Sequence, residues 1–162
     1  ELLDASPAQP EVTSCFLKSQ QRDDGGFVEF SPMRRSGTNP TAAAIGGLKI
    51  LGEVSPDLQS SAAEFLAGMQ TAEGGLRANT RIPIADLLSS FTGLFTLFEL
   101  GEHQRVRLEP LAQFASQLAA SDGGFCAALW DTDKDVEYTF YGLGTLALLA
   151  TAGHTSDFQR AS

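Results

Sequence analysis

The feature that most constrains this fold is a Gly-Gly pair that recurs at a constant spacing. The pair occurs at Gly25-Gly26, Gly74-Gly75 and Gly123-Gly124, each 49 residues after the one before. Such agreement without gaps indicates three copies of one structural unit. Other positions in the same register are Phe16, Phe65 and Phe114; Asp24, Glu73 and Asp122; Phe27, Leu76 and Phe125; Ile45, Leu94 and Leu143; Leu48, Leu97 and Leu146; and Leu51, Leu100 and Leu149.

Each unit has the pattern of two helices joined by a loop. The segment SSAAEFLAGMQ (60–70) has apolar residues at helical spacing, which is typical of an amphipathic helix. The Gly-Gly pair ends this helix, because glycine adopts a positive φ at little cost. After an irregular loop comes a second segment, such as ADLLSSFTGLFTLFELG (85–101), which is apolar nearly all round. This second segment is expected to be a helix buried on every side.

Capping residues indicate where the helices begin. Asp86 is the start signal in unit two, Thr38-Asn39-Pro40 in unit one, and Ser55-Pro56-Asp57 before the first helix of unit two. No segment has the alternation of a strand, so the prediction is an all-α fold of six helices in three hairpins. Residues 1–162 form one array, with unit one at 10–52, unit two at 57–101 and unit three at 107–153.

Composition excludes several classes of function. The net charge is −9, with 20 acidic against 11 basic residues, so a nucleic-acid partner is excluded. The uncharged run 138–153 is too short and glycine-rich to span a membrane. Cys15 and Cys126 form no paired motif, and no secretory leader is visible. Buried free thiols in a reducing, cytoplasmic compartment are therefore expected.

Three stacked hairpins leave an apolar flank at each end unless polar helices cap them or the array closes into a ring. Neither terminal unit has the polar character of a cap. The chain also begins at Glu1 rather than Met, so an upstream part is expected. We expect the flanks to be covered either by a second copy, in a homodimer, or by a separate N-terminal half.

The repeat resembles that of protein prenyltransferase β subunits and of squalene and terpene cyclases. The resemblance rests on Phe-Leu-x-x-x-Gln-x-x-x-Gly-Gly-Leu at 65–76 and on CFLKSQQRDDGGF (15–27), where Phe27 replaces the usual Trp. In that family about six such units close into an α/α toroid, and the inner helices line an isoprenoid pocket. The resemblance implies that this chain is about half of an α/α toroid and binds an isoprenoid or prenyl diphosphate.

Units two and three look most like the last part of Rab-type geranylgeranyl transferase β subunits. The resemblance implies a zinc site made of an Asp and a Cys two residues apart, with a His from the next unit. Asp86 matches the Asp, whereas Leu88 replaces the Cys and Tyr138 replaces the His. Zinc that activates a thiolate needs soft or imidazole ligands. We therefore expect the chain to bind no metal and no cofactor, which puts transferase activity in doubt.

A second alignment places Asp135-Val136-Glu137-Tyr138 on the family's Asp-Val-Cys-Tyr, with Glu137 in place of the Cys. The His would then fall beyond Ser162. The two histidines of the chain, His103 and His154, follow the helix ends at Gly101 and Gly153, so we expect them to lie in connections rather than to bind metal.

The acidic residues before the last segment invite comparison with the Asp-x-Asp-Asp acid of class II terpene cyclases. That acid needs two adjacent carboxylates, but Lys134 separates Asp133 from Asp135. We interpret Asp133 and Asp135 as caps of the inner helix, with an acid-catalytic role and a hard-cation site as open alternatives. The catalytic candidates are Asp86, Asp133, Asp135 and Tyr138.

Two residue types could bind the substrate. Arginines in the loops could hold a diphosphate, and aromatic residues of the inner segments could line an isoprenoid pocket. The alternatives are that the arginines lie in solvated loops and that the aromatic residues pack in the core. The alternative function is a non-catalytic scaffold for protein assembly or lipid binding. The substrate-binding candidates are Arg34, Arg35, Arg77, Arg81, Phe91, Phe95, Tyr138 and Tyr141.

Overall fold

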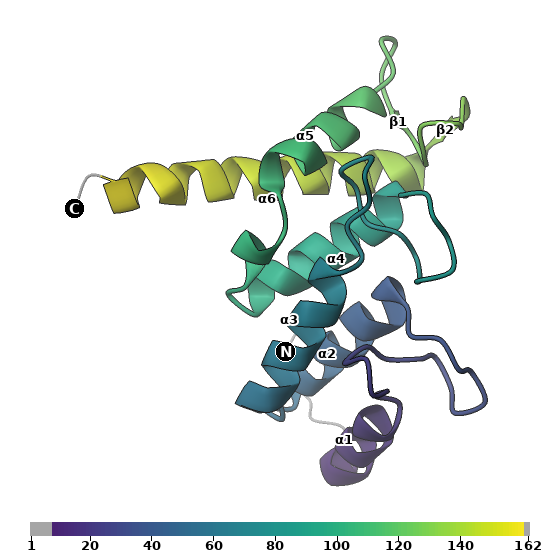
Figure 1. Ribbon diagram of the computed structural model, residues 1–162, viewed down its shortest axis with the longest axis vertical. Helices are drawn as coiled ribbons and strands as arrows, with labels where there is room; N and C mark the ends of the chain where they lie inside the picture. Colours follow the sequence, from purple (N-terminus) through teal and green to yellow (C-terminus); the bar gives the residue numbers. More distant parts are fainter. Residues whose placement is uncertain (1–7, 161–162) are drawn as a thin grey trace.

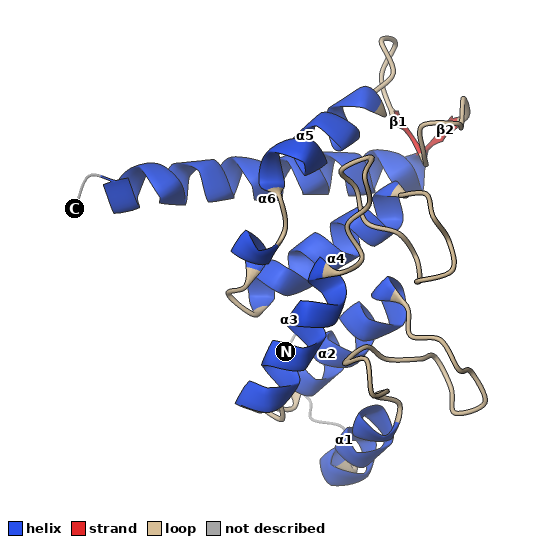
Figure 2. Ribbon diagram, in the orientation of Figure 1, coloured by secondary structure: helices blue, strands red, loops and turns tan. Residues whose placement is uncertain are grey.

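The computed structural model describes the backbone of residues 8–160 and the side chains of residues 8–153. Within this range the fold is almost entirely helical (Figures 1 and 2). The elements are α1 (Pro10–Ser19), α2 (Thr38–Ile50), α3 (Pro56–Ala67), α4 (Leu87–Glu99), the 3-10 helix η1 (His103–Arg105), α5 (Leu108–Gln117), β1 (Phe125–Cys126), β2 (Lys134–Asp135) and α6 (Val136–Arg160).

The three units follow one another along the molecule, from α1 and α2 at one end to α5 and α6 at the other (Figure 1). The outer helices are α1, α3 and α5, and the inner helices are α2, α4 and α6. The inner helices pack in sequence order, α2 against α4 and α4 against α6. The loops that lead into the inner helices all project on one side, at the right in Figure 1.

The first glycine of each pair has a positive φ, at 84° for Gly25, 99° for Gly74 and 94° for Gly123. Close packing adds a second constraint at two of these positions. A Cβ on Gly25 would lie 2.4 Å from the Ser61 carbonyl oxygen, and one on Gly74 would lie 2.3 Å from the Pro110 carbonyl oxygen. The loops of units one and two therefore rest directly on the backbone of the next outer helix.

In units one and two, the second glycine of the pair accommodates a phenylalanine from that next helix. A Cβ on Gly26 would lie 2.7 Å from the ring of Phe65, and one on Gly75 would lie 2.5 Å from the ring of Phe114. The repeated Phe of one unit thus packs on the repeated Gly-Gly pair of the unit before it.

A hydroxyl at the same position of each inner helix holds the preceding loop. Thr41, Ser90 and Thr139 are spaced by 49 residues. Each hydroxyl donates to the carbonyl four residues earlier. The acceptors of the backbone N–H groups of Phe27, Leu76 and Phe125 are Thr41 Oγ1 at 2.9 Å, Ser90 Oγ at 2.9 Å and Thr139 Oγ1 at 3.1 Å. Sequence reasoning missed this motif, although the spacing would have revealed it.

We expect Ser90→Ala to lower the free energy of unfolding by about 1–3 kcal/mol, because the buried Leu76 N–H would lose its acceptor. Ser90→Thr is the matched control, since Thr occupies the equivalent positions of the other two units. Urea denaturation compares the three proteins. An equal loss in both variants would show that the hydroxyl does not stabilise the loop.

The inner helices depart from the prediction of burial on every side. Phe95 on α4, and Phe140 and Leu143 on α6, are exposed, because the described units leave one face of each inner helix uncovered. The prediction that strands are absent is also wrong in detail, since β1 and β2 form a two-residue antiparallel pair. None of the described helices combines the length and the apolarity needed to cross a membrane.

Two further expectations, on the cysteines and on His154, are corrected. Cys15 is exposed and Cys126 is half-buried, so neither thiol is buried. Cys15 lies on the outer surface of α1, at the position that Glu64 and Gln113 occupy in the other units. Helix α6 continues past Gly153, so residue 154 lies within a helix, although the His154 side chain is outside the described ones. His103 lies in η1, and its ring stacks on Phe98 with centroids 4.2 Å apart.

Candidate functional site

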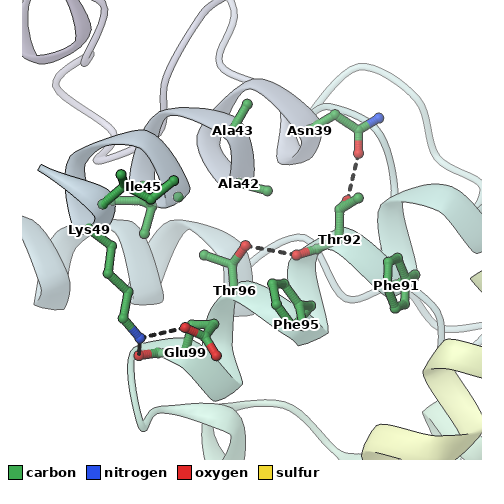
Figure 3. Close-up of a pocket in the computed structure, with 12 residues that line it drawn as sticks. Asn39, Ala42, Ala43, Ile45, Lys49, Phe91, Thr92, Phe95, Thr96 and Glu99 are labelled. Carbon is green, nitrogen blue, oxygen red and sulfur yellow. Dashed lines mark hydrogen bonds and ion pairs between the residues drawn. The ribbon is translucent and has the colours of Figure 1, made fainter. Parts of the chain in front are cut away.

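An apolar groove of about 560 Å³ runs between α2 and α4 on the inner side of the stack (Figure 3). Helix α2 contributes Ala42, Ala43 and Gly46, small residues that leave room, and α4 contributes Phe91 and Phe95. The sequence places small residues on one helix opposite rings on the other. This difference in size opens a channel between two helices that otherwise pack together.

Polar groups lie at the two ends of the groove. Near the start of α2, Thr92 Oγ1 donates to Asn39 Oδ1 over 2.6 Å. Near its end, Lys49 Nζ donates to Glu99 Oε2 over 2.5 Å and to the Glu99 carbonyl oxygen over 2.7 Å. Both side chains of this ion pair are partly exposed, so the pair adds little stability. The lining between the two ends is mainly apolar and suits a hydrocarbon chain.

An aromatic cluster continues the groove towards α6. Ring centroids of Phe91 lie 6.1 Å from Phe95, 5.4 Å from Phe140 and 5.6 Å from Tyr141. Tyr138 joins the cluster through Tyr141, with centroids 6.0 Å apart. The structure therefore brings together the four aromatic candidates Phe91, Phe95, Tyr138 and Tyr141, and the first two line the groove itself.

The four arginine candidates lie elsewhere. Arg34, Arg35 and Arg81 are exposed in the loops before α2 and α4. Arg77 is half-buried, and its Nη2 donates to the carbonyl oxygen of Gly68 at the end of the outer helix α3 over 3.4 Å. Among the described residues that line the groove, Lys49 is the basic one. Diphosphate binding by the arginines stays a prediction.

The acidic candidates occupy the starts of the inner helices. Asp86 caps α4, where its carboxylate accepts from Ser89 N at 2.7 Å and from Ser89 Oγ at 2.8 Å. Asp135 occupies the equivalent position before α6 and accepts from Tyr138 N at 2.8 Å. Asp133 is exposed in the preceding loop, where its N–H donates to Asp131 Oδ1 over 3.0 Å. The cap of α6 is therefore Asp135 rather than Asp133.

The residues that the resemblance places at the zinc position do not fit zinc. Leu88 has no ligand atom, and both oxygens of Asp86 hold the helix start. Burial, followed by the charge of nearby Asp86, raises the pKa of Tyr138, so this phenol stays protonated at neutral pH. Across the described residues, His, Cys, Asp and Glu form no group of three arranged for a metal. That the protein works without zinc stays a prediction.

The carboxylate of Asp86 gives a test that depends on pH. Burial raises its pKa, so the folded state holds the proton more tightly than the unfolded chain, whose pKa is about 3.9. The contribution of Asp86 to stability therefore falls as pH rises from about 4 through the raised folded pKa. We expect the stability of Asp86→Asn relative to the wild type to increase over this window, because asparagine also caps helices.

Asp86→Ala is the control for that experiment, since it removes the cap at every pH and should cost about 1 kcal/mol. Chemical denaturation of the three proteins between pH 4 and pH 7 measures both effects. A constant difference between the wild type and Asp86→Asn would contradict a raised pKa.

The comparisons with known proteins agree with this geometry. The sequence profile of the prenyltransferase alpha-alpha toroid domain matches residues 4–77 and 41–161. The chain belongs to this family. The predicted fold class, an all-α toroid of helical hairpins, is thereby confirmed, and so is the broader family resemblance.

Among solved structures, this prenyltransferase toroid is similar to "Candida albicans protein geranylgeranyltransferase-I complexed with GGPP". The TM-score is 0.75 and the identity is 21%, which shows a shared fold. The match covers 83% of this chain and 42% of the other, so the chain spans less than half of that relative. No curated protein matches the chain.

Proposed function

We propose that this toroid chain binds an isoprenoid, or the hydrocarbon part of a prenyl diphosphate, in the groove between α2 and α4. The observation that carries the proposal is the apolar stretch of the groove, where Ala42, Ala43 and Gly46 face Phe91 and Phe95. A volume of about 560 Å³ lies within the range of small-molecule sites. The structural relative from Candida albicans, which was solved with GGPP, supports the same class of ligand.

We propose further that zinc-dependent prenyl transfer has been lost. The resemblance of units two and three to Rab-type β subunits supports descent from a transferase, and Leu88 and Tyr138 at the ligand positions support the loss. Asp86 and Asp135 cap helices, and a catalytic role for these two residues stays a prediction. A catalytic role for Asp133 and Tyr138 stays a prediction as well. A cytoplasmic location also stays a prediction.

Calorimetric titration tests the ligand class. We expect geranylgeranyl diphosphate and geranylgeraniol to bind with affinities within about tenfold of each other, because the apolar chain supplies most of the contact area. Inorganic diphosphate is expected not to bind. The opposite ranking, with diphosphate bound and the alcohol not, would place the site in the arginine loops instead.

A variant that fills the groove tests its location. Ala43→Trp is expected to weaken geranylgeraniol binding more than tenfold, because the indole would occupy the apolar stretch. The control is Ala72→Trp, which places the same ring at an exposed position in the turn after α3. Equal affinities in the two variants would contradict this location. Absence of binding by the wild type would favour the alternative function, a scaffold for protein assembly.

A further inference from the structure

The groove between α2 and α4 ends at an ion pair that joins the two helices. Lys49 lies in the last turn of α2, and Glu99 is the last residue of α4. Figure 3 shows both side chains at the end of the groove opposite Asn39 and Thr92. Lys49 and Glu99 are the charged residues among the described ones that line the groove, so the lining as a whole carries no net charge. A ligand that reaches this end meets a positive and a negative group side by side.

We propose that this ion pair makes the groove select isoprenoids with a neutral hydroxyl head, the prenyl alcohols, over those with an anionic head. Glu99 is the specificity-determining residue, because its carboxylate occupies the ammonium group that an anion would need. The inference rests on the proposed function, since it concerns the same groove and the same class of hydrocarbon. It adds the chemistry of the head group and the direction in which the ligand lies.

The hydrogen bonds of Lys49 support this selectivity. An ammonium group has three N–H donors. Lys49 directs two of them to Glu99, one to Oε2 over 2.5 Å and one to the backbone carbonyl oxygen over 2.7 Å. One donor is left for a ligand, and Oε1 of Glu99 accepts from no described residue. A hydroxyl head can accept from that donor and donate to that oxygen, so it satisfies both groups.

An anionic head fits the same end poorly. A carboxylate or an ionised diphosphate has acceptors but no proton to donate to Glu99. It would also place like charges next to each other, which is unfavourable. The side chains of the ion pair are 43–46% exposed, so water weakens this repulsion without removing it. We therefore expect a preference of about fivefold for the alcohol, within the tenfold range expected from the shared hydrocarbon chain.

The opposite end of the groove suits the hydrocarbon tail. Thr92 already pairs with Asn39 there. Beyond this pair, the ring of Phe91 packs against Phe140 and Tyr141, so the apolar surface continues from the groove towards α6. In Figure 3, α6 is the yellow helix on the side of Phe91. A tail that leaves the groove past Phe91 places the head at the ion pair.

Charges near the starts of α4 and α6 favour the same direction. Burial, followed by the negative charges of Asp86, Asp135, Asp131 and Glu137, raises the pKa of Tyr138. An anionic head at this end would therefore face several carboxylates. The described arginines of the neighbouring loops are not among the residues that line the groove. Neither end thus offers an uncompensated positive charge, which favours a neutral head group.

Two variants that each remove one charge test the inference in opposite directions. Calorimetric titration gives the ratio of the dissociation constant for geranylgeranyl diphosphate to that for geranylgeraniol. Glu99→Gln frees the ammonium group of Lys49, so we expect this ratio to fall about fivefold. Lys49→Gln leaves the carboxylate without its partner, so we expect the ratio to rise about threefold. A merely structural role would weaken both ligands together and leave the ratio unchanged.

Glu53→Gln is the matched control. Glu53 pairs with Lys18 over 2.5 Å, and the two side chains are 45% and 43% exposed, so this ion pair resembles the first but lies outside the groove lining. The control makes the same change in net charge and should leave the ratio as in the wild type. An unchanged or raised ratio in Glu99→Gln, or an equal fall in Glu53→Gln, would overturn the inference alone. A wild type that binds neither compound would overturn the proposed function, and the inference with it.

Discussion

The Gly74→Ala variant is expected to lose about 2–5 kcal/mol of unfolding free energy. The backbone φ at position 74 is 99°, and a residue with a Cβ adopts this angle at a cost of about 1–2 kcal/mol. The new methyl group would also lie 2.3 Å from the Pro110 carbonyl oxygen, so the backbone must shift, at a cost of about 1–3 kcal/mol. Urea denaturation measures the sum, and the melting temperature should fall by about 10 °C.

Gly101→Ala separates the two contributions. Gly101 also has a positive φ, 73°, but an added Cβ would meet no described atom within 4 Å. Its substitution should therefore cost only the conformational part, about 1–2 kcal/mol. If Gly74→Ala and Gly101→Ala were equally destabilising, close packing between consecutive units would not be the reason for the Gly-Gly pair.

The second large effect is expected from Phe114→Ala. Phe114 is 1% exposed and fills the space above Gly75, so its removal should cost about 3–5 kcal/mol and leave a cavity between units two and three. Trp130→Ala removes a larger ring that is 70% exposed, and should change stability by no more than about 0.5 kcal/mol. Thermal unfolding of both variants makes the comparison. Similar losses in the two would refute the assignment of Phe114 as the anchor between units.

The architecture could be predicted from sequence because its determinants repeat. The Gly-Gly pair, the Phe of the outer helix and the apolar inner segment each occur three times in one register, and the structure uses the Phe and the Gly-Gly pair in the same contact at both junctions between units. Exposure could not be predicted in this way. Whether Phe16 or Phe65 is covered depends on whether a unit lies before it, and periodicity carries no such information.

The site was predictable in part, for a related reason. The aromatic candidates lie on inner helices whose mutual packing follows from the repeat, so they gather as a cluster. The arginines lie in loops, where side-chain direction depends on local contacts. Arg77 turns to the carbonyl of Gly68, and nothing in its sequence context favours that acceptor over a phosphate. The groove results from a size difference between α2 and α4, which appears only when the two helices are placed together.

The contacts between neighbouring inner helices limit how such a repeat protein can evolve. The backbone contacts repeat from unit to unit, but the seam residues alternate in size, with Ala42 across the groove from Phe95 and Gly144 beneath Phe91. If units two and three exchanged places, Phe140 would face Phe95, and Ala42 would face Gly144 across a void. The units share one backbone arrangement, but they cannot replace one another. The volumes of these few side chains determine the order in which the units can follow one another along the chain.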